Sequence, residues 1–179
     1  GAVEHHEREI IEGVFGLGDR TVRQIMTPRT DVYALEATAS IGEVVDALLE
    51  SGYSRAPVYE KDLDHVVGVV HARDVLRLVR AGKLHAPVRN AMRQPWFIPE
   101  QSRAATLLGL FKKNQQHLAV VVGELGTVEG VVTLEDVMEE ASKGLPMSFA
   151  LNTFRNPKTV KTAPRVETKQ PAKKSGKDV

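Results

Sequence analysis

The chain has 179 residues, of which 42% are hydrophobic and 26% are charged, and its formal net charge is +1. These values are typical of a soluble globular protein with one or two small domains. The sequence contains no cysteine, which excludes a disulfide framework, a cysteine-based zinc site and a thiol nucleophile. Its apolar runs are far shorter than the roughly 18 residues that a membrane-spanning helix requires.

The near-zero net charge conceals a basic tail. Eight Lys and Arg follow residue 154 against only Glu167 and Asp178, so the tail carries +6 and residues 1–154 carry about −5. Almost no large apolar residue follows Phe154. Because such a segment buries too little apolar surface to offset its ordering entropy, we expect residues 145–179 to be disordered. The tail is either a solubilising terminus or truncated linker, or a contact for nucleic acid or anionic lipid, and we favour the first interpretation.

The first predicted element is an amphipathic helix over residues 4–17, which should pack on the rest of the chain or on a partner. After it, the sequence is duplicated. Val-Arg-Gln-Ile-Met at 22–26 returns as Val-Arg-Asn-Ala-Met at 88–92, and Gly-Val-Val-His-Ala-Arg-Asp-Val returns as Gly-Val-Val-Thr-Leu-Glu-Asp-Val. We therefore divide the chain into a linker helix (1–19), two repeats (20–82 and 83–144) and the tail (145–179).

Each repeat is predicted to fold as β-α-β-β-α. Strands are expected over 31–35, 55–59 and 65–70 in the first repeat, and over 96–98, 118–122 and 128–132 in the second. Helices are expected over 41–51, 74–79, 104–113 and 134–142, the first of them opened by a capping box at Ser40 and Glu43. Because one repeat of about 60 residues cannot bury a sizeable core, the two should pack as a single α/β module with a pseudo-twofold axis.

The strand–helix junction at 130–136 supports two interpretations. Thr133 as the N-cap and Asp136 three positions later would form a reciprocal cap that stabilises by about 1 kcal/mol. The same open helix end is also a ready anion site, at which Thr133 donates to a phosphate oxygen and Asp136 accepts from the ribose hydroxyls. His71 and Asp74 occupy the same places in the first repeat, where the bulkier imidazole predicts a weaker or differently selective site.

These features together resemble a known family. Two copies of this unit resemble a tandem CBS-domain pair, or Bateman module. Ile-Met-Thr-Pro-Arg-Thr-Asp at 25–31 and Ser-Arg-Ala-Pro-Val-Tyr-Glu at 54–60 are similar to the CorC/TlyC hemolysin-like branch of magnesium and cobalt efflux proteins, which is related to the CNNM transporters. The resemblance covers about residues 7–142. It implies a homodimeric regulatory module, in the cytoplasm at the inner face of the membrane, that belongs to a longer membrane protein and gates its ion-transport domain.

The resemblance also implies the ligand, ATP or AMP with ATP favoured and with Mg²⁺ able to accompany ATP, and the residues that hold it. Asp136 would bind the ribose hydroxyls. Thr133 and Ser54 would bind the α-phosphate, and Arg55 the outer phosphates through its planar guanidinium. The base would be lined by Thr27, Tyr33, Tyr53, Pro57 and Val132. The second repeat replaces Met-Thr-Pro by Met92-Arg93-Gln94-Pro95, and this loss of the threonine argues against a second nucleotide site.

No motif specifies catalysis. The sequence has neither a Gly-x-Ser-x-Gly elbow nor a Gly-x-x-x-x-Gly-Lys loop. His5 and His6 are adjacent on a predicted helix and face different ways, so we assign no metal site. We therefore predict a non-enzymatic nucleotide sensor. Its main rival is a purely structural dimerisation module that binds no ligand; nucleic-acid binding through the tail is a weaker alternative.

Overall fold

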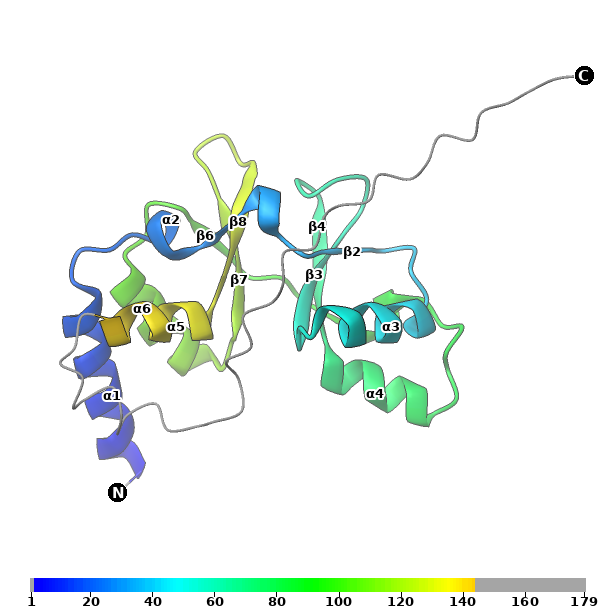
Figure 1. The fold of residues 1–179 in the computed structure, drawn as a ribbon, viewed down its shortest axis with the longest axis horizontal. Helices are drawn as coiled ribbons and strands as arrows, with labels where there is room; N and C mark the ends of the chain where they lie inside the picture. Colours follow the sequence, from blue (N-terminus) through cyan, green and yellow to red (C-terminus); the bar gives the residue numbers. More distant parts are fainter. Residues whose placement is uncertain (1, 144–179) are drawn as a thin grey trace, which may run out of the picture.

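The computed structural model describes residues 2–143, so the tail predicted to be disordered lies outside the described residues. Two four-stranded sheets lie side by side, each with its own set of helices (Figure 1). One sheet has the strand order β1-β8-β7-β6 and the other the order β2-β3-β4-β5. The α/β module of two repeats predicted from the sequence is confirmed.

Each sheet is completed by a short strand that comes from the other repeat. β1 (Thr27–Pro28) lies in the first repeat but pairs antiparallel with β8 (Val128–Thr133) of the second. Reciprocally, β5 (Met92–Arg93) pairs antiparallel with β4 (Val66–His71) of the first repeat. The two sheets therefore do not follow the division of the chain at residues 82 and 83.

In the first repeat, β2 (Leu35–Glu36) runs parallel to β3 (Arg55–Tyr59), and β3 is antiparallel to β4. α3 (Ile41–Ser51) opens at the predicted capping box, in which the hydroxyl of Ser40 accepts from the N–H of Glu43. It ends at Gly52, whose φ of 73° places it in the left-handed region that glycine adopts without strain. α4 (Ala72–Arg80) follows β4 directly.

The prediction of a strand over residues 31–35 is wrong for most of these residues. Residues Arg29–Asp31 form a 3-10 turn, η1, and the strand is limited to Leu35–Glu36, opposite Val58–Tyr59. The turn is closed by the N–H of Val32 on the carbonyl of Arg29. The chain needs this turn because β1 lies in one sheet and β2 in the other.

The second repeat repeats the pattern with β6 (Phe97–Pro99), α5 (Ala104–Asn114), β7 (Leu118–Val122), β8 and α6 (Leu134–Lys143). A 3-10 turn, η2 (Val88–Ala91), precedes β5. The leading helix α1 (Ala2–Leu17) and the short α2 (Val22–Ile25) pack on this repeat, against α5 and α6. The predicted helix is thus confirmed, and its partner is the second repeat.

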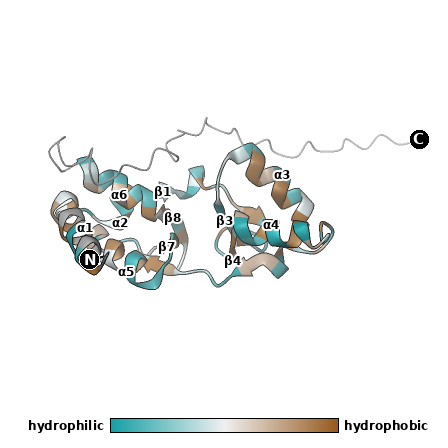
Figure 2. Ribbon diagram, turned by 90° about the horizontal axis from the view of Figure 1, so that it is seen from below, coloured by the Kyte–Doolittle hydropathy of each residue, from teal (hydrophilic) through white to brown (hydrophobic). Residues whose placement is uncertain are grey.

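Hydrophobic side chains from the strands and helices form the interior, and the ribbon in Figure 2 shows by colour where hydrophobic residues occur along these elements. Each repeat has its own core, which contains Phe111 and Leu107 in the second repeat and Ile41 and Val44 in the first. A third cluster joins the repeats. It consists of Val66 and Val69 from β4, Leu118 and Val120 from β7, and Val128 from β8.

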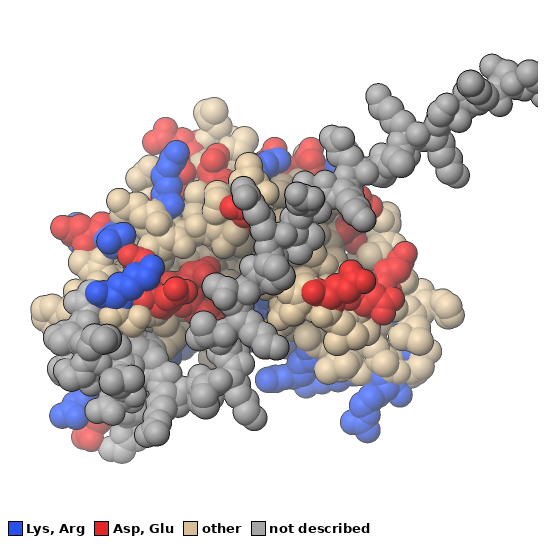
Figure 3. Space-filling view, viewed as in Figure 1, with Lys and Arg blue, Asp and Glu red and all other residues tan. Residues whose placement is uncertain are grey.

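Charges divide unevenly over the surface. In Figure 3, acidic side chains gather over α3 and α6, and basic side chains extend below α4. None of the helices within residues 2–143 has both the length and the apolarity that crossing a membrane requires.

Candidate functional site

The junction of β8 and α6 contains the predicted reciprocal cap. The N–H of Thr133 donates to Asp136 Oδ2 at 2.9 Å, and the N–H of Asp136 donates to the hydroxyl oxygen of Thr133 at 3.2 Å. Burial raises the pKa of Asp136, although the hydrogen bonds from Thr133 act in the opposite direction. The cap uses Asp136 Oδ2 and does not engage Asp136 Oδ1, so capping and ligand binding are compatible at this junction.

Next to this junction lies a cleft of about 620 Å³ between the two repeats. Residues from the starts of β3 and α4 form one side, and residues from the end of α5 and the start of β7 form the other. The lining residues that carry polar or charged groups are Ser54, Arg55, His71, Arg73, Arg93, Lys112, Gln115, Gln116 and His117.

The cleft is strongly basic. Burial, followed by the nearby charges of Arg93 and Arg55, lowers the pKa of His71 to about 4. Burial and the charge of Arg55 also lower the pKa of His117. Both imidazoles are therefore neutral at pH 7, and the lining arginines and Lys112 set the sign of the potential. A concave, positively charged cleft of this kind attracts polyanions.

Arg55 connects the cleft to the junction. Its Nη1 lies 3.8 Å from Oε1 of Glu135, in the first turn of α6, and His117 Nδ1 lies 3.9 Å from the same atom. Within the described residues, Arg55 Nε and His117 Nδ1 are the two buried side-chain polar atoms without a hydrogen-bond partner. Arg55 Nε is a donor, and a buried donor in this state is suited to a ligand that supplies an acceptor oxygen.

The nine predicted site residues fall into four groups. Thr27 in β1 lies opposite Val131 in β8, the strand that ends at Thr133, and Thr133 and Asp136 cap α6. Ser54 and Arg55 line the cleft. The rings of Tyr33 and Tyr53 stack with centroids 5.6 Å apart, and the Tyr33 hydroxyl donates to the carbonyl of Ala47 at 3.0 Å.

Pro57 and Val132 form the fourth group, and both are buried within the sheets. Val132 belongs to the core of the second repeat, and Pro57 lies opposite Val69 in the neighbouring strand. Of the nine predicted residues, Ser54 and Arg55 line the cleft, and the other seven do not.

Sequence reasoning missed several basic and amide residues of the cleft: Arg73, Arg93, Lys112, Gln115, Gln116 and His117. The duplication contained a signal for two of them. Gln116 and His117 stand at the offset of 62 residues from Ser54 and Arg55, at the start of the equivalent strand. Applying the repeat offset to each predicted contact residue would have located that second side of the cleft.

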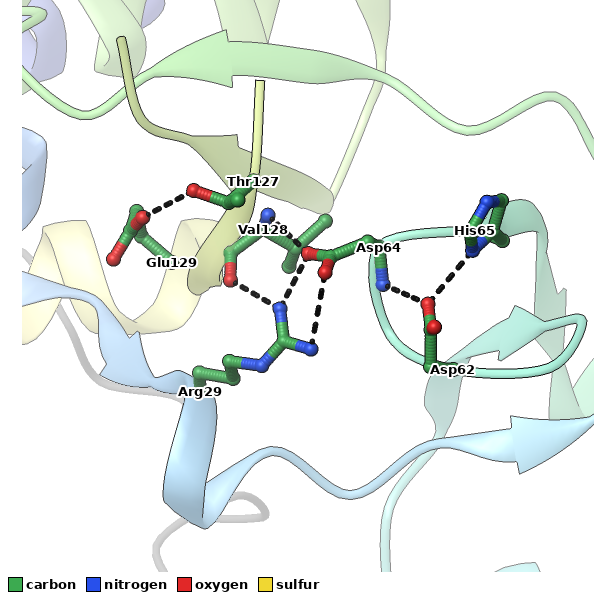
Figure 4. Close-up of polar contacts among 7 residues, drawn as sticks. All are labelled: Arg29, Asp62, Asp64, His65, Thr127, Val128 and Glu129. Atoms are coloured by element: carbon green, nitrogen blue, oxygen red, sulfur yellow. Dashed lines mark hydrogen bonds and ion pairs between the residues drawn. The ribbon is translucent and has the colours of Figure 1, made fainter. Parts of the chain in front are cut away.

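A polar clasp holds the repeats together at the other end of β4 and β8 (Figure 4). Arg29 Nη1 donates to Asp64 Oδ1 at 2.5 Å and to the carbonyl of Val128 at 2.9 Å. Asp64 Oδ1 also accepts from the N–H of Val128 at 2.9 Å. Asp64 precedes β4 and Val128 begins β8, so this Arg29–Asp64 clasp links the two sheets opposite the cleft.

Within residues 2–143, no three His, Asp or Glu side chains gather into a cation site. The polar features described above are thus a capped helix start, an aromatic pair and a basic cleft, arranged around the interface of two duplicated units. The family model for the CBS domain matches residues 22–81 and again residues 88–143. The chain belongs to the CBS-domain family.

The CBS pair is also similar to transport proteins. It is 34% identical over 137 residues to the magnesium and cobalt efflux protein CorC of Escherichia coli, a match that covers 76% of this chain and 47% of CorC. The chain thus spans about half the length of that relative. Homology to CorC confirms the family predicted from the Met-Thr-Pro and Ser-Arg phrases.

Solved structures give the same result. The CBS domain of the bacterial CNNM/CorC family Mg²⁺ transporter in complex with ATP matches with a TM-score of 0.68 and 39% identity, over 76% of this chain and 96% of that one. A CBS-domain pair with bound AMP from Klebsiella pneumoniae matches with a TM-score of 0.59 and 29% identity, over 67% and 96%. Both matches support the assigned fold.

Proposed function

We propose that this CBS pair is a regulatory sensor that binds one adenine nucleotide, preferentially ATP, at the junction of β8 and α6 and in the adjoining basic cleft. The observation that carries the proposal is the continuity of these two features. An open helix start with Thr133 and Asp136 adjoins, through Arg55 and Glu135, a cleft with an excess of cationic side chains. Similarity to CBS structures in complex with ATP and with AMP gives independent support.

The proposed pose follows from the available hydrogen-bonding atoms. Asp136 Oδ1 accepts from a ribose hydroxyl while Oδ2 keeps the N–H of Thr133. The hydroxyl of Thr133 keeps the N–H of Asp136 as a donor and gives its own proton to the α-phosphate. The base lies toward Thr27 and the stacked Tyr33 and Tyr53.

The basic cleft favours a triphosphate over a monophosphate. Ser54 would bind the α-phosphate, and Arg55 would exchange its 3.8 Å contact with Glu135 for the outer phosphates. Arg73 and Lys112, which line the same cleft, would add to the attraction. AMP has no β- or γ-phosphate to reach these groups. Mg²⁺ would arrive with ATP by bridging its phosphates, which requires few protein ligands.

Regulation would act by population shift. Phosphates that contact both repeats at the cleft favour the arrangement in which the repeats are close, and a ligand shifts such an equilibrium by its differential affinity for the two states. We propose that the pair acts as a homodimer at the cytoplasmic face of the membrane and passes its occupancy to the ion-transport domain of a longer parent protein. The similarity to CorC supports a role in magnesium or cobalt transport.

Thermal unfolding with ATP, ADP and AMP, each with and without Mg²⁺, tests the nucleotide proposal. A ligand at 100 times its dissociation constant adds about 2.7 kcal/mol, which raises the melting temperature of a domain of this size by about 5–10 °C. We expect the largest rise with ATP. Asp136→Asn should remove the rise, and Asp74→Asn, its counterpart in the first repeat, should retain it.

If no nucleotide at millimolar concentration shifts the melting temperature, the sensor proposal fails. The purely structural dimerisation module then becomes the better account. An equal rise for the wild type and Asp136→Asn would also contradict the proposed site.

A further inference from the structure

The two repeats place the same acidic residue at the same point of the fold but give it different partners. Asp136 in the first turn of α6 accepts from the backbone N–H of Thr133 and keeps Oδ1 for a further donor. Asp74 in the first turn of α4 has both oxygens engaged. Arg93 Nε donates to its Oδ2 at 2.6 Å and Arg77 Nη1 donates to its Oδ1 at 3.2 Å.

Strand register identifies Arg93 as the counterpart of Thr27. Thr27 in β1 lies opposite Val131 in β8, and Arg93 in β5 lies opposite Val69 in β4. Val69 and Val131 are equivalent residues of the duplicated Gly-Val-Val phrase. The guanidinium of Arg93 thus projects from the position that, in the second repeat, holds a residue of the nucleotide site.

The ion pair is strong by its geometry. A bond of 2.6 Å between a guanidinium and a carboxylate is charge-assisted and short. The side chain of Asp74 is 15% exposed, and the hydrogen bond from Arg93 lowers the pKa of this carboxyl. A ribose diol that replaced Arg93 would substitute neutral donors for a cation beside a largely buried carboxylate, which is unfavourable.

We propose that Arg93 is a built-in occupant of the second nucleotide site, and that it restricts this CBS pair to one nucleotide per chain. This inference rests on the proposed function, because it assumes that the site of the second repeat, where no arginine pairs with the aspartate, binds the nucleotide. It attributes the difference in nucleotide binding between the two repeats to one side chain, Arg93. His71 contributes less to blocking the first-repeat site. An imidazole at the position of Thr133 leaves the backbone of the site intact, whereas Arg93 forms an ion pair with the Asp74 carboxylate itself.

Calorimetric titration with ATP measures the stoichiometry directly. We expect one ATP per chain for the wild type and two for the double variant His71→Thr with Arg93→Thr, which copies the second repeat into the first. His71→Thr alone should stay at one, because Arg93 still holds Asp74. Arg77→Ala, which removes the other partner of Asp74, should also stay at one.

A substitution in the second repeat tests whether an arginine at this position blocks nucleotide binding, and it does so through a loss of binding and not a gain. Thr27→Arg places a guanidinium at the equivalent point of the second repeat, where it should pair with Asp136 and weaken ATP binding at least 100-fold. Thr27→Met adds similar bulk without charge and should weaken binding tenfold at most. Circular dichroism and the melting temperature of each variant confirm folding before titration.

The outcomes separate the two proposals. One ATP for both the wild type and the double variant, together with unchanged binding by Thr27→Arg, overturns the role of Arg93 and leaves the proposed function intact. Two ATP molecules on the wild type overturn it as well. If the wild type binds no ATP and the double variant binds one, the role of Arg93 is supported and the proposed function fails. If neither the wild type nor any variant binds ATP, both proposals are rejected.

Discussion

At the scale of single residues, capping and the proposed nucleotide recognition use the same side chains. Thr133 and Asp136 stabilise the start of α6 through two reciprocal hydrogen bonds, in which Asp136 uses Oδ2 and not Oδ1. The helix can therefore be formed before the nucleotide arrives. A preformed site reduces the entropy that binding must offset.

The environment of Asp136 predicts how its substitution affects stability. Burial raises its pKa above the unfolded value, so its contribution to stability is greatest below the unfolded pKa and is lost as the pH rises through the folded pKa. Asparagine does not titrate and can still accept the N–H of Thr133. At pH 7, we expect the melting temperature of Asp136→Asn to equal that of the wild type or to lie slightly above it. Differential scanning calorimetry measures both temperatures. A loss of more than about 2 kcal/mol would contradict this account of the cap.

His71 predicts a loss of stability in acid. Its folded pKa of about 4 lies below the unfolded value of 6.5 because of burial and the charges of Arg93 and Arg55, whereas Asp74 acts in the opposite direction. Stability from this group is therefore present above pH 6.5 and is lost as the pH falls toward 4. Part of the ring reaches solvent, so we expect about 1 kcal/mol.

The measurement compares urea unfolding of the wild type and His71→Gln at pH 7.5 and pH 5. The wild type should lose more stability between the two pH values than the variant. His117 and the other titrating groups are common to both proteins, so they cancel in the comparison. An identical pH dependence would show that His71 is not held in the basic cleft.

At the scale of elements, the helices and long strands were predictable and the exchanged strands were not. α3, α5, β3 and β7 follow from a capping box, helical periodicity and β-branched runs, and their observed bounds agree with the prediction to within a residue. β1 and β5 have two residues each. A segment of two residues has no periodicity, so only tertiary structure reveals its partner.

Two glycines of the duplicated phrase allow the exchanged strands to approach. A Cβ on Gly130 would collide with the backbone carbonyl of Thr27 in β1, and a Cβ on Gly68 would meet the side chain of Met92 in β5. Backbone yields less readily than a flexible methionine. The first contact therefore determines where Thr27 lies relative to β8.

We expect Gly130→Ala to cost about 1–3 kcal/mol and to weaken ATP binding at least tenfold, because it displaces β1. Gly68→Ala is the matched control, since it disturbs β5 and should leave ATP affinity within about threefold of the wild type. Chemical denaturation and calorimetric titration of the two variants measure both effects. Equal ATP affinity for Gly130→Ala and the wild type would separate β1 from the site.

At the scale of the whole molecule, the two repeats meet along β4, β7 and β8. An apolar cluster around Val69 and Val120 fills the middle of this interface. The Arg29–Asp64 clasp closes one end, and the basic cleft lies at the other, about 20 Å away along six-residue strands. In the population shift that we propose, the clasp would therefore be the fixed end of the interface.

Loss of the clasp should loosen this interface. Arg29→Ala removes the hydrogen bond that chiefly holds the pKa of Asp64 below its usual range, and we expect its melting temperature to fall by a few degrees. Asp64→Asn should cause a similar fall, and the double variant should add little to either, since both act on one contact. Fully additive effects would show that the two side chains stabilise independently.

The candidate site was predicted from two kinds of signal. Thr133 and Asp136 belong to the repeated Gly-Val-Val phrase, whereas Ser54 and Arg55 came from the family resemblance. In the structure Thr133 and Asp136 cap α6, and Ser54 and Arg55 line the cleft. The basic residues on α5 and β5 were not found, since their relation to the site depends on how the repeats pack. Pro57 and Val132 stay predictions; the structure places both in buried strand positions, which alternation along a strand alone does not reveal.

The most direct test of the central claim is a crystal structure of this chain grown with ATP and Mg²⁺. The account predicts density for one nucleotide per chain, with the ribose hydroxyls on Asp136 and the phosphates extending past Thr133 to Arg55 and the basic cleft. Nucleotide at Asp74, or phosphates directed away from the cleft, would contradict it.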